Sequence, residues 1–108
     1  MEKVLVASAV AESLFATETA VEEALTRAVA LMRQMMDARR ALGLSVAAGD
    51  PAFQRVTAAM NALGDAQREL VRTHGELEAL GKTLGLPAMG FGPLIKPTGG
   101  QPELRPMD

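Results

Sequence analysis

The chain has 108 residues, the size of one domain, and a formal net charge of −2. Proteins that bind nucleic acid usually carry a basic excess that neutralises phosphates, so this charge predicts no nucleic-acid partner. The absence of cysteine excludes disulfides, thiolate metal sites and cysteine nucleophiles, and it favours a cytoplasmic location. Aromatic residues make up only 3% of the chain, so Ala, Leu, Val and Met supply most of the apolar area. Because Ala, Leu and Met are strong helix formers, the composition favours an all-α fold.

The N-terminal segment, residues 4–11, is an apolar run that ends in Ala9-Val10-Ala11, a pattern similar to a signal-peptidase site. The run is shorter than a usual signal sequence, and apolar residues continue beyond Glu12 at helical spacing. We therefore expect this segment to belong to a helix of the mature protein and not to a cleaved signal sequence. We also expect no membrane span, because no stretch approaches the roughly 20 apolar residues that a span needs.

A first helix is predicted from near the N-terminus to about Leu42. Apolar residues recur at every seventh position, which is the spacing of a coiled-coil seam. The seam consists of Ala7, Leu14, Val21, Ala28, Met35 and Leu42, with Leu31 and Ala38 at intermediate positions. The sequence Thr19-Ala20-Val21-Glu22 fits a capping box and would allow a break at that point. The repeat nevertheless passes through Thr17 unbroken, so we expect one continuous helix.

A second helix is predicted to begin at Asp50-Pro51, because Asp caps free amides and Pro fits the first turn. Its apolar pattern again has heptad spacing. The seam residues are Phe53, Val56, Met60, Leu63, Gln67, Leu70, His74, Leu77 and Leu84. Gly85 and Pro87 then stop the helix. Since residues 43–49 form a short link, the two helices are expected to pair as an antiparallel hairpin.

The first helix carries more apolar surface than one partner helix covers. A second stripe runs beside its seam, at spacings of four, three and four residues. The residues of this second stripe are Leu25, Val29, Met32 and Met36. On the second helix, Ala52, Ala59 and Ala66 would allow another helix to approach closely. The stripe predicts a homodimer that forms a four-helix bundle; the alternative is a groove kept for another protein.

From residue 86 the composition changes to a Pro- and Gly-rich tail, so we expect a helical hairpin at 1–85 and an extended docking tail at 86–108. Disordered tails are usually poor in large apolar residues, but this one is not. Its candidate docking residues are Leu86, Met89, Phe91, Leu94 and Ile95. Two landing sites are open: the second stripe of the same chain, or a separate protein.

The sequence contains no convincing catalytic, metal-binding or cofactor-binding motif. His74 is the only histidine, and the Glu-x-x-His motif of di-iron bundles is absent because Val71 precedes it by three residues. Histidine phosphotransfer is disfavoured by Glu76 and Glu78, whose charges would repel a phosphate. We interpret Gln67 and His74 as polar seam residues that fix the register of the helices.

The sequence therefore predicts a non-enzymatic interaction module, such as an adaptor, a small chaperone or a structural subunit of a larger assembly. We expect a homodimer and a protein partner bound through the tail or the second stripe. The alternative is a metal-binding or phosphotransfer bundle that uses His74.

Overall fold

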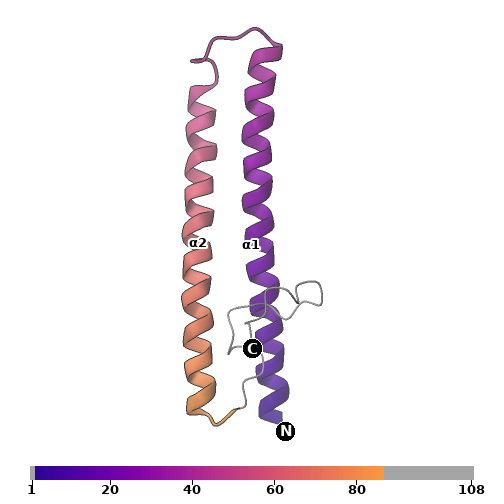
Figure 1. Cartoon of the computed structure of the whole chain (residues 1–108), viewed down its shortest axis with the longest axis vertical. Coiled ribbons are helices and arrows are strands. Elements are labelled where there is room, and N and C mark those ends of the chain that lie inside the picture. Colours follow the sequence, from indigo (N-terminus) through magenta and orange to yellow (C-terminus); the bar gives the residue numbers. More distant parts are fainter. Residues whose placement is uncertain (1, 87–108) are drawn as a thin grey trace, which may run out of the picture. The chain divides into compact units, whose positions relative to one another are not determined.

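The structure is a computed structural model, and it describes residues 2–86. Helix α1 spans Glu2–Ala41 and helix α2 spans Asp50–Thr83, and the two form a helical hairpin (Figure 1). Residues 2–86 contain no strand. The predicted all-α hairpin is confirmed. The predicted tail, apart from Leu86, lies outside the described residues.

Helix α1 runs through Thr19 without a break, so the prediction of one continuous helix is confirmed. The threonines along it do not interrupt the backbone pattern. Thr17 Oγ1 donates to the carbonyl of Ser13 at 2.8 Å, and Thr26 Oγ1 donates to that of Glu22 at 3.1 Å. These bonds to the preceding turn satisfy the hydroxyl groups within the helix.

The chain divides into two compact units. The first comprises Met1–Thr17 and Glu69–Asp108, and the second comprises Glu18–Arg68. In the first unit, Ala7, Ala11 and Leu14 are buried. Larger side chains pack around them and are partly buried: Phe15, Leu70, Leu77 and Leu86. The two buried alanines leave little side-chain bulk on this face of α1.

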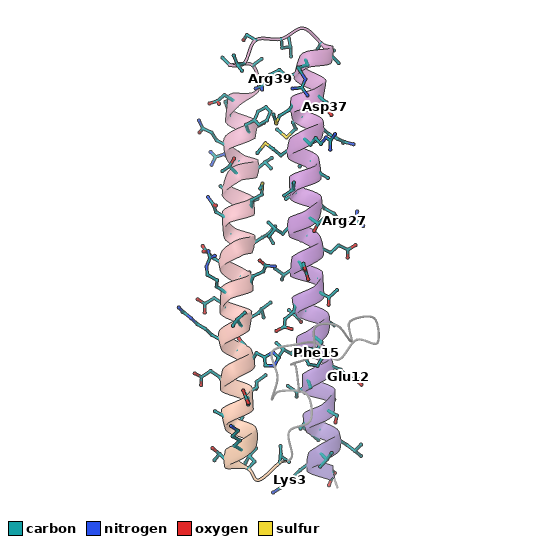
Figure 2. All side chains as sticks on the ribbon, viewed as in Figure 1. Lys3, Glu12, Phe15, Arg27, Asp37 and Arg39 are labelled. Atoms are coloured by element: carbon teal, nitrogen blue, oxygen red, sulfur yellow. The ribbon has the colours of Figure 1, made fainter. Side chains whose placement is uncertain are left out.

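In the second unit the side chains that line the paired faces are only half-buried. On α2 they include Phe53, Val56 and Met60, as the predicted seam requires. The guanidinium carbon of Arg39 lies 4.8 Å from the centre of the Phe53 ring, a cation–π contact that shows which face of α1 meets α2. In Figure 2 sulfur atoms gather between the helices near the loop, where flexible methionines fill gaps in the packing.

The intermediate seam positions of α1 differ from the prediction. Leu31 and Ala38 were expected in the seam, but both are exposed. Leu25 and Met32 are half-buried instead. They precede Arg39 by fourteen and seven residues, so they share its face of the helix, because seven residues complete nearly two turns. The heptad pattern alone allowed either pair of residues at the intermediate positions of the seam. The contact of Arg39 with Phe53 selects Leu25 and Met32.

The loop ends and α2 begins at Asp50, as predicted. Gly49 has a positive φ of 79°, and its carbonyl accepts the first backbone bond of the helix from Phe53 at 3.0 Å. The Asp50 carboxylate accepts a hydrogen bond from Gln54 Nε2 at 2.8 Å. Pro51 occupies the first turn, where its missing amide hydrogen costs nothing.

The end of α2 is a Schellman motif centred on Gly85, which has a φ of 74°. The amide of Leu86 donates to the carbonyl of Gly81 at 2.9 Å, and the amide of Gly85 donates to that of Lys82 at 3.1 Å. The same kind of motif ends α1 at Gly43, whose φ is 67°. The turn at Gly85 directs Leu86 back onto the core of the first unit.

One property of α1 stands against the expectation of no membrane span, without deciding it. The helix contains an 18-residue window with a mean hydropathy of 1.5, so by length and composition it could cross a membrane. The expectation had counted only uninterrupted apolar residues, whereas the polar residues in this window are few and scattered. Only 17% of the window is buried. Signal sequences and core helices of soluble proteins have the same composition, so this property does not assign a membrane location.

Replacing Gly85 by Ala should lower the free energy of unfolding by about 1 kcal/mol, because a residue with a Cβ is strained at positive φ. Gly75 provides the matched control: it lies inside α2, and a Cβ at either glycine meets no atom within 4 Å. Gly75→Ala should therefore stabilise the protein by roughly 0.5–1 kcal/mol. Urea unfolding measures both changes, and equal shifts in the two variants would contradict the helix-end assignment.

Candidate interaction surfaces

The structure divides the second stripe of α1 into two parts. Leu25 and Met32 are half-buried on the face that meets α2. Val29 is 50% exposed and Met36 is 38% exposed. Because they are seven residues apart, Val29 and Met36 lie on one side of the helix and form its uncovered apolar flank. Together these two residues are the outer flank of α1.

Further exposed apolar residues lie outside the predicted surface. Leu31 is on α1, and Leu42, Leu44 and Val46 are on the loop. The loop is held by a hydrogen bond from Arg39 Nη1 to the Val46 carbonyl at 2.9 Å. Sequence reasoning treated this segment only as a connection, although its alternation of apolar residues with glycine and serine was a visible signal.

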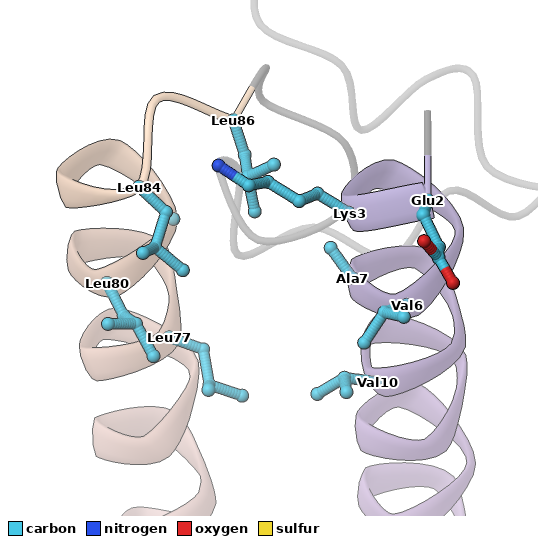
Figure 3. A pocket seen from close by; sticks show the side chains of 10 residues that line it. Glu2, Lys3, Val6, Ala7, Val10, Leu77, Leu80, Leu84 and Leu86 are labelled. Atoms are coloured by element: carbon cyan, nitrogen blue, oxygen red, sulfur yellow. The ribbon is translucent and has the colours of Figure 1, made fainter.

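A groove opens in the first unit, between the start of α1 and the end of α2. Its volume is about 420 Å³, within the size range of small-molecule and side-chain pockets. Aliphatic side chains from both helices line it: Val6, Ala7, Val10, Leu77, Leu80 and Leu84. Leu86 adds a wall, and Lys3 reaches across the end of the groove toward it (Figure 3). The groove was not predicted, because it needs the register of the two helices as well as their patterns.

His74 is 1% exposed and lies in the first unit. The centre of its ring is 5.9 Å from that of Phe15, with the two planes tilted by 52°. This is within the range of favourable aromatic packing. Gln67 is half-buried. Both positions agree with the predicted seam; that these two side chains fix the register remains a prediction.

The charged residues form local pairs on the helix surfaces. Arg40 pairs with Asp37 at 2.7 Å near the loop, and Arg27 pairs with Glu23 at 3.2 Å. All four side chains are more than half exposed, and such pairs contribute little to stability. Within residues 2–86, no three His, Asp or Glu side chains gather as a metal site would require.

Comparisons with known protein families, with curated proteins and with solved structures find no match to this chain. Its function is therefore inferred from its own residues and geometry.

His74→Ala should lower the free energy of unfolding by about 2 kcal/mol, because it empties the space of a buried ring packed against Phe15. Thr73→Ala is the control, since Thr73 is next to His74 in the sequence but its side chain is exposed. Its effect on the free energy of unfolding should stay within about 0.5 kcal/mol. Chemical denaturation with detection by circular dichroism measures both. Equal, small effects in the two variants would show that His74 is not part of the packed interior.

Proposed function

We propose that this protein is a non-enzymatic interaction module that pairs with a second copy of itself through α1 to form a four-helix bundle. As an assembled bundle it would serve as an adaptor, a small chaperone or a structural subunit. The observation that carries this proposal is the exposed outer flank, Val29 and Met36, beside a seam that is itself only half-buried.

The shortage of buried apolar surface supports a need for a partner. Among residues 2–86 the buried hydrophobic side chains are Ala7, Ala11 and Leu14, two of which are small. A chain of this size is only marginally stable unless most of its apolar area is buried. Fully burying one Val or Met side chain stabilises a protein by roughly 1.5–3 kcal/mol. Because the outer flank is already partly covered, about half of that remains to be gained at each residue.

The position of the outer flank suits a bundle. Val29 follows the seam residue Ala28 by one position, which places it about 100° around the helix. In a four-helix bundle each helix packs against two neighbours on adjacent sides, so an apolar face at this angle can meet the second neighbour. Ala52 and Ala59 on α2 are small and exposed, and they would allow close approach of a helix on that side.

The alternative function, a metal-binding or phosphotransfer bundle that uses His74, gains no support from these surroundings. Phosphotransfer requires an imidazole that another protein can reach, and His74 is 1% exposed. Its ring faces Phe15, an apolar neighbour that supplies no metal ligand. We therefore assign His74 to packing.

A cytoplasmic location is part of the proposal. It is supported by the absence of cysteine and by the exposed charged pairs along both helices. The apolar window of α1 is the opposing observation. A dimer through α1 would cover some of that apolar surface in water, which reconciles the composition of the helix with a soluble assembly.

The combined change Val29→Glu and Met36→Glu should convert a micromolar dimer to monomer, because two charges per chain would lose water at the interface. Analytical ultracentrifugation measures the mass directly. Val71→Glu is the control: Val71 is exposed on α2 to a degree similar to Val29, and it should leave the dimer intact.

A wild-type protein that sediments as a folded monomer at these concentrations would refute the homodimer. A dimer that persists unchanged in the double variant would place the interface elsewhere, for example at Leu31 on the other side of the seam.

A further inference from the structure

The groove in the first unit is an open apolar site with no assigned occupant. Val6 and Val10 on α1 and Leu80 and Leu84 on α2 line it and are each about half exposed. Among the described residues that line it, the charged ones are Glu2 and Lys3. Such a lining selects an aliphatic or aromatic side chain, because a polar group would lose its water without gaining a partner.

The start of the tail is built into this groove. Leu86 belongs to the groove wall and also packs on the core of the first unit. The Schellman motif at Gly85 fixes the backbone there, with the Leu86 amide bound to the Gly81 carbonyl at 2.9 Å. The residues that follow Leu86 are therefore attached to the chain at the groove itself.

The length and composition of the following residues fit the groove. From Leu86 to Phe91 a fully extended chain spans at most about 18 Å, at roughly 3.3–3.6 Å per residue. The groove extends along α1 from Lys3 to Val10, about 10 Å at 1.5 Å per residue. Phe91 is flanked by Gly90 and Gly92. Because glycine has no side chain, the backbone on either side of Phe91 can approach the groove closely. The aromatic ring would supply the large apolar area that the groove leaves uncovered.

We infer that the groove is the docking site of the chain's own residues 89–95, with Phe91 as the main anchor. This site differs from the second stripe considered from the sequence. It concerns the first unit, whereas the proposed dimer uses the outer flank in the second unit, so either inference can fail without the other. Pro87 and Pro93 lower the entropy that the segment loses on docking, since they restrict its undocked conformations.

The absence of cysteine from the chain allows a direct test by disulfide crosslinking. The test pair is Leu80→Cys with Gly92→Cys, which keeps the Phe91 ring, and the matched control is Val71→Cys with Gly92→Cys. Leu80 lines the groove and is 52% exposed; Val71 does not line it and is 54% exposed. A disulfide requires the two Cα atoms to come within about 7 Å. We expect the test pair to form an intramolecular disulfide at least about tenfold faster than the control.

Each other outcome overturns the inference. A disulfide that forms only between chains would show that the groove holds the tail of a second copy. Equal rates in test and control pairs would show that the tail does not dock there. If equal rates are accompanied by flotation of the protein with phosphatidylcholine–phosphatidylglycerol vesicles, the groove is a lipid site.

A second measurement does not depend on crosslinking geometry. Phe91→Ala should lower the thermal midpoint by roughly 5 °C in the wild-type background and by much less in a Leu80→Glu background, where the groove no longer accepts the ring. Leu104→Ala is the tail control and should leave the midpoint unchanged. Full additivity of Phe91→Ala and Leu80→Glu would overturn the inference.

Discussion

Two paired helices can cover only one stripe on each other, and this limit governs the rest of the structure. In the first unit the limit is met with small residues: Ala7 and Ala11 are buried on a face of α1 where larger side chains would hold the helices apart. In the second unit larger side chains occupy the seam and remain half-buried. Apolar area is therefore left uncovered in both units, at the groove in one and at the outer flank in the other. Both proposals describe ways to cover it.

Polar contacts do little to offset this shortage. The ion pairs are exposed and local, as in Arg27 with Glu23 and Arg72 with Glu69, so each contributes only some tenths of a kcal/mol. Within residues 2–86 the buried polar side chain is His74, whose packing against Phe15 adds area to the interior. Stability must come mainly from apolar burial, and both proposals rest on this requirement.

The sequence was sufficient to predict the all-α hairpin, because heptad spacing, Asp50-Pro51 and Gly85 are local signals with direct physical meaning. It was not sufficient to assign Leu25 and Met32 to the seam in place of Leu31 and Ala38. That choice depends on the rotation of α1 about its axis, which is set by contacts such as that of Arg39 with Phe53. The groove was missed for a related reason, since it is formed by residues on two helices and by the turn at Gly85.

The central claim is that the hairpin does not complete its apolar core alone but does so with a second copy. The most direct test is the thermal midpoint of the wild-type chain at 1 µM and at 100 µM. A dimer gains stability by mass action, so we expect the midpoint to rise by roughly 5 °C over this hundredfold range. A midpoint that is independent of concentration, with a cooperative transition, would contradict the claim and show that one chain folds without a partner.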